Sequence, residues 1–309
     1  MNPDPRLALF NRHRTVRTYK NETLKPGDLE QILWAAQRAP TDATAQMYSF
    51  VRLTNPALRQ EIATITGNPQ IETASEAFIV LADVNRLQRL LEHRGYEFGD
   101  WPAIAIHFGI GDAVLAGQNM LIAAEILGYA GCWIGGVLSA LERIVDVLEL
   151  PNGVLPFAGL TIGVSDETPA QRPRIQPELV LHENKYRTPE THELETALER
   201  MAPISARGDW AQTLSRYFAK DGTMEARELQ LRRTLERQGF GHVGSDSGGS
   251  INQLMNRALE AGYKEILVRK VGESFQAWVD RPDRAHSGEG TSPHDALEQA
   301  VRTAEADQG

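Results

Sequence analysis

The chain has 309 residues, of which 41% are hydrophobic and 24% are charged, and its formal net charge is −9. These values are ordinary for a globular protein and allow two domains. The acidic balance argues against a nucleic-acid partner or an anionic membrane surface, because both need broad positive fields. The single cysteine, Cys132, excludes an intramolecular disulfide and a multi-thiolate metal site.

Residues 1–10 lack the long apolar stretch of a secretory leader, and no later window approaches the ~18 to 20 apolar residues of a membrane span. We therefore expect a cytoplasmic protein with no membrane partner. Residues 5–11 are expected to form a short helix that leads into His13-Arg14-Thr15-Val16-Arg17.

This basic stretch places two guanidiniums, an imidazole and a hydroxyl close together along the chain. Arginine forks match phosphate oxygens in a bidentate geometry. A solvent-exposed basic turn is the alternative, since charged runs usually face water. A second pair, Arg172 and Arg174, lies far along the chain on either side of the stiff Pro173. Two separate arginine clusters on an acidic protein favour an anion site.

Hydrophobic spacing predicts the main elements in chain order. Helices are expected from Pro26 to about Pro40 and over residues 56–66, 84–98, 104–127 and 141–148. Strands are expected over residues 47–53, 77–82, 131–136 and 157–164. Their irregular alternation predicts an α+β sandwich rather than a doubly wound parallel sheet. The helix over 104–127 is rich in alanine and glycine, which suits a central or dimer-forming helix.

Three loops could approach a ligand. Residues 41–46 are small and polar, and residues 67–70 form a turn by composition. Gly135 and Gly136 end a strand, where they would permit positive φ and bring backbone N–H groups near a ligand. Each loop is also consistent with an ordinary turn. Gly109-Ile110-Gly111 falls short of G-x-G-x-x-G, which argues against a Rossmann nicotinamide domain.

No hydrolytic or metal constellation is present in the sequence. Neither His182-Glu183 nor His192-Glu193 continues into H-E-x-x-H, so a zinc site is not expected. We also find no Ser-His-Asp, Cys-His or paired-carboxylate arrangement. A bound cofactor would supply the chemistry without such groups.

Several motifs together carry a family resemblance over about residues 4–240. They are His13-Arg14-Thr15-x-Arg17, Ala39-Pro40-Thr41 with Gln46, Trp133-Ile134-Gly135-Gly136, Leu155-Pro156-Phe157-x-Gly159, Arg172-Pro173-Arg174 and Leu181-His182-Glu183-Asn184-x-Tyr186. In this order and spacing the chain resembles the FMN-dependent nitroreductase family, in the branch of NADPH-dependent oxygen-insensitive nitroreductases and NADPH-flavin oxidoreductases.

The resemblance implies a three-layer α/β/α sandwich that dimerises, with each FMN held at the interface by both subunits. It implies that His13, Arg14, Thr15 and Arg174 hold the phosphate and ribityl chain, and that Arg17 and Arg172 serve the phosphate or the pyrimidine edge. The flavin ring would be lined by Thr41, Thr44, Gln46, either Asn68 or Gln70, and the backbone of Ile134, Gly135 and Gly136.

The implied reaction is ping-pong hydride transfer. NAD(P)H would reduce the flavin at N5 and leave, and a nitroaromatic, a quinone or free flavin would then be reduced. A flavin-binding sensor or carrier without turnover is the alternative, because it would share every flavin contact.

The sequence departs from the family pattern in three places. Leu138 stands where this branch often has arginine, and Asn68-Pro69-Gln70 is one residue shorter than the pattern. The branch selects NADPH with C-terminal arginines, for which only Arg200, Arg207 and Arg227 are candidates here. The resemblance therefore leans towards NADPH over NADH.

The C-terminal third divides into three segments. Residues 189–238 are expected to form two or three helices, which either wrap a partner subunit or form a bundle of their own. Residues 241–250 are a flexible linker by composition. Residues 251–309 are expected to form a small α-β-β-α module of unknown role, which the family resemblance does not cover.

Overall fold

The computed structural model describes residues 4–205, 209–241, 265–271, 274–281, 284–290 and 293–306. The chain divides into two compact units, Met1–Phe240 and Gly241–Gly309. Among the described residues, no helix has both the length and the apolar character needed to cross a bilayer.

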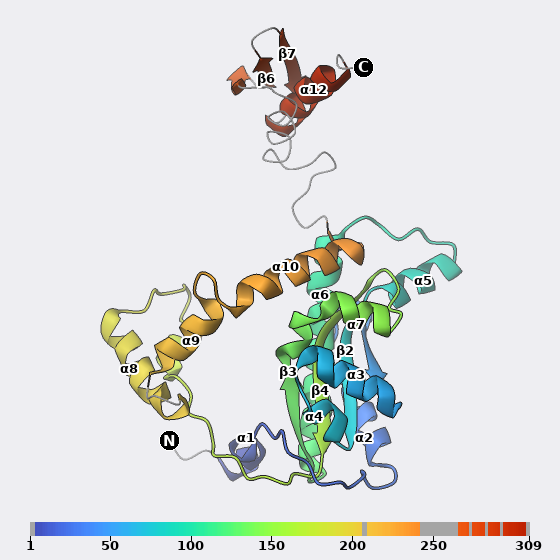
Figure 1. The fold of residues 1–309 in the computed structure, drawn as a ribbon, viewed down its shortest axis with the longest axis vertical. Helices are drawn as coiled ribbons and strands as arrows, with labels where there is room; N and C mark the ends of the chain where they lie inside the picture. Colours follow the sequence, from blue (N-terminus) through green and yellow to red (C-terminus); the bar gives the residue numbers. More distant parts are fainter. Residues whose placement is uncertain are drawn as a thin grey trace. The chain divides into compact units, whose positions relative to one another are not determined.

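A four-stranded antiparallel sheet forms the centre of the first unit (Figure 1). The strands lie in the spatial order β1-β2-β4-β3, and their bounds are β1 Tyr48–Arg52, β2 Glu76–Asp83, β3 Ala130–Ile134 and β4 Val154–Gly163. The two central strands, β2 and β4, are buried along nearly their whole length. This burial explains the continuous apolar runs in their sequences, because both faces of each strand are covered.

Helices cover both faces of the sheet, so the unit is a three-layer α/β/α sandwich, as expected. One face is covered by α2 Asp28–Ala36 and α6 Pro102–Ile126, the other by α3 Pro56–Thr66, α4 Gln70–Thr73 and α7 Leu141–Val147. The small residues of α6 allow close packing, since a Cβ on Gly117 would lie 2.4 Å from the Trp133 ring. The alanines and glycines of α6 therefore let this helix lie against the sheet.

Short elements complete the body of the first unit. They are the helices α1 Ala8–Arg12 and α5 Asn85–His93 and the 3-10 turns η1 Pro5–Leu7, η2 Asp42–Thr44, η3 Gly135–Ser139, η4 Pro177–Leu179 and η5 Ala202–Ile204. Two predictions need correction here. The strand expected over 131–136 ends at Ile134 and continues as η3, and the turn expected over 67–70 leads directly into α4.

An extended N-terminal segment ties the first residues to the sheet. Thr15 bridges Gly131 at the start of β3, and Tyr19 bridges Ser165 just beyond β4. Tyr19 Oη donates to the Val16 carbonyl at 2.8 Å, and burial raises the pKa of its phenol. The segment between these bridges is thus fixed at one end of the sheet.

Beyond β4 the chain leaves the sandwich and returns (Figure 1). The helices α8 Thr191–Met201 and α9 Trp210–Phe218 lie apart from the sheet, and α10 Thr223–Arg237 leads back to it. An ion pair of 2.5 Å between Arg237 Nη2 and Asp146 Oδ1 joins α10 to α7. Phe240 is 3% exposed and closes this part of the core.

The described part of the second unit contains one more strand than the sequence predicted. β5 Glu265–Val271, β6 Ser274–Arg281 and β7 Arg284–Gly290 form an antiparallel sheet in chain order, followed by α12 Pro293–Ala306. The first helix of the predicted α-β-β-α module, expected before residue 265, and the linker residues 242–250 lie outside the described residues. β7 was missed because its sequence, Arg-Ala-His-Ser-Gly-Glu-Gly, has little hydrophobic alternation. A Cβ on Gly288 would lie 2.3 Å from the Ala296 carbonyl, so only glycine allows α12 to pack this closely.

Candidate functional site

The two basic motifs meet at one cavity of about 240 Å³ in the first unit. The motif residues that line it are His13, Arg14, Thr15, Arg17, Arg172 and Arg174, and the wall is completed by Phe10, Glu167, Pro169, Ala170 and Gln171. The segment before the first strand and the segment after the last strand of the sheet therefore meet at one concave surface. We refer to it as the basic cavity.

Local backbone geometry explains how the first motif reaches the basic cavity. Helix α1 ends at Arg12, and His13 leaves the helix with φ −50° and ψ 129°. The Val16 N–H donates to the Gly131 carbonyl at 3.2 Å, and the Val16 side chain is 2% exposed. Because successive side chains of an extended segment alternate in direction, burial of Val16 turns Thr15 and Arg17 away from the core.

The wall of the basic cavity carries four guanidiniums and one carboxylate, that of Glu167. Arg14 and Arg174 each turn one guanidinium nitrogen back onto neighbouring backbone carbonyls, at 2.8 to 3.1 Å. Across residues 4–205 and the other described ranges, none of these four guanidiniums has a carboxylate oxygen within 4.0 Å. Their positive charge is therefore available to an anionic ligand, and the donor set suits a phosphate.

Glu167 organises the backbone of the first motif rather than neutralising it. Its Oε1 accepts the backbone N–H of Arg17 at 2.5 Å and that of Thr18 at 3.0 Å. These hydrogen bonds, that from Arg17 foremost, hold the pKa of the Glu167 carboxyl below its ordinary value. The carboxylate thus stays ionised while it fixes the segment that carries Arg17.

His13 is oriented by a carboxylate on α6. Its Nδ1 donates to Glu125 Oε1 at 2.5 Å, and the Glu125 side chain is only 11% exposed. This contact fixes the ring plane and assigns the Nδ1 proton, which leaves Nε2 as the nitrogen that can meet a ligand.

The paired glycines lie beside Asn68. Neither has a positive φ, so the left-handed backbone that glycine permits is not adopted there. The requirement at Gly136 is steric instead, because a Cβ would lie 2.0 Å from Asn68 Nδ2 and 2.7 Å from the Thr66 carbonyl. A Cβ on Gly135 would meet nothing within 4 Å, so the surface over Gly135 is open.

Asn68 and Gln70 differ in exposure. Asn68 Nδ2 donates to the Thr66 carbonyl at 2.6 Å, and its Oδ1 accepts from Gln70 Nε2 at 3.1 Å. Gln70 is 6% exposed, whereas Asn68 is half-buried. Of the two amides, Asn68 therefore has the surface to offer a ligand.

Strand β3 relates this glycine turn to the basic cavity. Its second residue, Gly131, lies beside Thr15, and the strand carries the chain on to Gly135. Four residues of extended strand span about 13 Å. One elongated ligand could therefore reach from the basic cavity to the glycine turn.

The loop of residues 41–46 belongs to a different part of the surface. Asp112 on α6 binds its two ends, and Glu125 on the same helix binds His13. These two carboxylates are thirteen positions apart, which corresponds to about 20 Å of helix. Within one chain, Thr41, Thr44 and Gln46 are thus not brought to the basic cavity, and they are absent from its wall.

The candidate NADPH arginines also separate. Arg227 on α10 donates from Nε to Ser139 Oγ at 3.0 Å, which places it at the end of η3, the turn that begins with the paired glycines. Arg200 is exposed on α8. Arg207 lies outside the described residues.

Sequence reasoning missed the two carboxylates that organise the basic cavity. Glu125 lies 112 positions from His13 and Glu167 lies 150 positions from Arg17. No local motif contains either residue, so the only available signals were an acidic residue in the last turn of a predicted helix, Glu125, and one just beyond a predicted strand, Glu167.

Comparisons with known proteins agree with this geometry. The sequence model of the nitroreductase family matches residues 11–164. An FMN reductase (NADPH) of Bacillus subtilis is 33% identical over 177 residues, which cover 56% of this chain and 71% of that protein. An oxygen-insensitive NADPH nitroreductase of Salmonella typhimurium is 30% identical over 235 residues, which cover 75% of this chain and 91% of that protein.

Structural comparison gives the same result. The NfrA1 nitroreductase of Bacillus subtilis superposes with a TM-score of 0.70 at 26% sequence identity, over 76% of this chain and 99% of that chain. The matched family sequence contains the first basic motif, the residue 41–46 loop and the glycine turn. The chain therefore belongs to the nitroreductase family, and it is an oxidoreductase.

Proposed function

We propose that this chain is an FMN-dependent oxidoreductase that takes hydride from NADPH and passes it to a nitroaromatic, a quinone or free flavin. The proposal rests first on relatives that are named NADPH-dependent FMN reductase and NADPH nitroreductase. These relatives are reductases, which favours turnover over the alternative of a flavin-binding sensor or carrier. Since NADPH is an intracellular reductant, we place the enzyme in the cytoplasm.

The basic cavity is the observation that carries the proposal. Four guanidiniums that have no carboxylate oxygen within 4.0 Å among the described residues fit the phosphate of FMN, whereas a neutral ligand would not need this positive charge. In this proposal Arg14, Arg174 and His13 bind the phosphate with Thr15. Arg17 and Arg172 add charge at the same wall, where they would also favour the negative charge of a reduced flavin.

The glycine turn would receive the flavin ring. Gly135 offers an open backbone surface, and Asn68 holds an amide beside it. FMN, when bound, supplies the hydride chemistry, so the protein needs to bind, orient and exclude water rather than donate or accept protons. That division of labour agrees with a site built from guanidiniums, amides and backbone groups.

A homodimer would complete the site. Thr41, Thr44 and Gln46 lie about 20 Å along α6 from the basic cavity, so a flavin that contacts both sets would draw them from two protomers. Large apolar side chains are exposed on α2, α6, α8 and α9, including Trp34, Leu115, Ile126, Leu194 and Phe218. Apolar surface of this extent is typical of a protein interface.

We assign the nicotinamide cosubstrate to the side of α10. Arg227 lies at the end of the glycine turn, where a guanidinium could meet a phosphate of NADPH. Arg200 and Arg207 remain the other candidates. Because the donor and the acceptor would use the same flavin face in turn, parallel double-reciprocal plots are expected.

The proposal is tested by anaerobic titration of the purified protein, reconstituted with FMN, with NADPH and separately with NADH. We expect the oxidised flavin absorbance to bleach, and to bleach at lower concentration with NADPH. A flavin that binds but stays oxidised would support the sensor or carrier instead. A protein that cannot be loaded with FMN would contradict the proposal.

A further inference from the structure

The loop of residues 41–46 has an unusual backbone. Ala43, Thr44 and Gln46 have φ values of 45°, 58° and 53°, although none of them is glycine. A side chain makes this left-handed region unfavourable, so such residues persist only where surrounding contacts impose the conformation. Three of them within four positions require a specific restraint.

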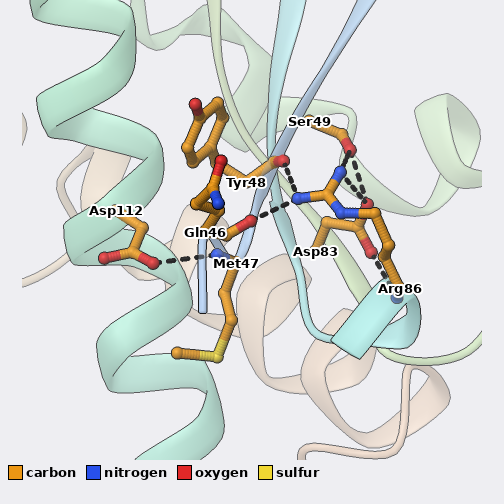
Figure 2. A network of polar contacts seen from close by, with 7 residues as sticks. All are labelled: Gln46, Met47, Tyr48, Ser49, Asp83, Arg86 and Asp112. Atoms are coloured by element: carbon orange, nitrogen blue, oxygen red, sulfur yellow. Dashed lines mark hydrogen bonds and ion pairs between the residues drawn. The ribbon is translucent and has the colours of Figure 1, made fainter. Parts of the chain in front are cut away.

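A buried carboxylate restrains the loop from its N–H side. Asp112 is 3% exposed, and its Oδ1 accepts the backbone N–H of Asp42 at 3.1 Å. Its Oδ2 accepts the backbone N–H of Met47 at 2.8 Å (Figure 2). Ala45 is right-handed and Gln46 is left-handed, the pairing that gathers successive N–H groups into an anion-binding concavity. Of the N–H groups at this turn, Asp112 accepts that of Met47, while the Ala45 N–H donates to the Asp42 carbonyl at 2.8 Å.

A guanidinium restrains the same loop from its carbonyl side. Arg86 on α5 donates from Nη2 to the backbone carbonyls of Gln46 and, at 2.8 Å, Tyr48 (Figure 2). Its Nη1 donates to Ser49 Oγ at 2.8 Å and to Asp83 Oδ2 at 3.3 Å. The fork of Arg86 is thus fixed by Asp83 and Ser49 while it holds the loop.

We propose that Asp112 and Arg86 are positioning residues that clamp the loop of residues 41–46 between a carboxylate and a guanidinium, and so set Thr41, Thr44 and Gln46 against the flavin ring. The assignment to the flavin rests on the proposed function. The clamp itself rests on the hydrogen bonds above. Neither Asp112 nor Arg86 lines the basic cavity, so each acts through the loop and leaves the phosphate contacts alone.

The test uses the full-length variants Asp112→Asn and Arg86→Lys. Asparagine keeps the shape but replaces one acceptor with a donor, so one loop N–H loses its partner. Lysine keeps the charge but cannot reproduce the fork. Asp100→Asn and Arg89→Lys serve as matched controls, because both residues are exposed and neither hydrogen-bonds to the loop.

Two readouts separate positioning from general stability. We expect both variants to bind FMN and riboflavin more weakly by the same factor, about tenfold. The ratio of the FMN affinity to the riboflavin affinity is then unchanged. Hydrogen exchange of the Asp42 and Met47 amides should accelerate in Asp112→Asn, while amides of β2 and β4 stay protected. Both controls should match the wild-type protein in both readouts.

Equal flavin affinity in the variants and the wild type would overturn the inference. The inference would also be overturned if hydrogen exchange in the variants is faster throughout the sheet and the FMN to riboflavin affinity ratio falls as well. The two residues would then stabilise the whole fold. If the wild-type protein binds no flavin, the proposed function fails. The exchange measurement would then still decide whether Asp112 clamps the loop.

Discussion

At the scale of single residues, the two adjacent glycines of the η3 turn have different requirements. Gly136 is needed because Asn68 and the Thr66 carbonyl occupy the space of a Cβ, whereas Gly135 has open space around it. The sequence pairs the glycines, but only the neighbouring chain distinguishes them. Asn68 links the stability of the turn to the surface that we assign to the flavin ring.

This difference gives a paired prediction on the protein without flavin. Gly136→Ala should lower the free energy of unfolding by about 2 kcal/mol, because the new methyl group overpacks against Asn68 and backbone. Gly135→Ala should change it by less than about 0.5 kcal/mol. Urea unfolding of both variants measures these changes. Equal losses of unfolding free energy in the two variants would contradict the steric argument.

Cys132 provides a contrasting case at this scale. It is 2% exposed, and burial raises the pKa of its thiol. A buried thiol with a raised pKa is a poor nucleophile. Cys132 is therefore a small core residue.

At the scale of elements, carboxylates join segments that are distant in sequence. Glu167 connects the segment after β4 to the N-terminal segment through the N–H groups of Arg17 and Thr18. Glu125 connects α6 to His13. The basic cavity therefore depends on contacts between elements as much as on its own arginines.

The Glu167 contact predicts a pH dependence of stability. Because its pKa is lower in the folded protein, the ionised carboxylate stabilises the fold above the ordinary pKa of 4.5, and this stabilisation is lost as the pH falls through the folded value. The wild type should melt at a higher temperature than Glu167→Gln. This difference in melting temperature should be constant near pH 7 and shrink below about pH 4.5.

The matched control for this measurement is Glu195→Gln, since Glu195 is exposed on α8. Its melting temperature should follow that of the wild type at every pH. A gap for Glu167→Gln that stays constant into the acid range would show that the carboxylate charge is not what stabilises the segment.

At the scale of the whole molecule, the first unit ends at a structural boundary. Phe240 is 3% exposed within the core cluster that contains Met47 and Leu155, and the next unit begins at Gly241. The core of the first unit is therefore complete once Phe240 is included. The family match also lies entirely inside this unit.

A pair of truncations tests this boundary. A chain of residues 1–241 should keep the thermal stability of the first unit, its oligomeric mass by light scattering and its flavin affinity. A chain of residues 1–238 removes Phe240 and should lose about 3 kcal/mol of unfolding free energy. If the chain of residues 1–241 fails to assemble or to bind flavin, residues 242–309 have a functional role.

The sequence by itself determined the fold class, the strong elements and the composition of the site. Continuous apolar runs predicted β2 and β4, and helical spacing predicted α3 and the central part of α6, because burial imposes these local patterns directly. The basic motifs likewise predicted an anion site, and the structure brings their residues together at one cavity. Weak local signals failed at β7 and α4.

Only the tertiary structure decided which residues restrain the site. In the sequence Asp112 and Glu125 are only polar positions on one helix. In the structure Asp112 binds the backbone of Met47 and Glu125 binds the side chain of His13. In the sequence Arg86 is one of several charges of α5, yet its guanidinium binds the backbone carbonyls of Gln46 and Tyr48, 40 and 38 positions earlier. These contacts depend on where elements meet in space, and the local pattern of a side chain carries no information about its distant partner.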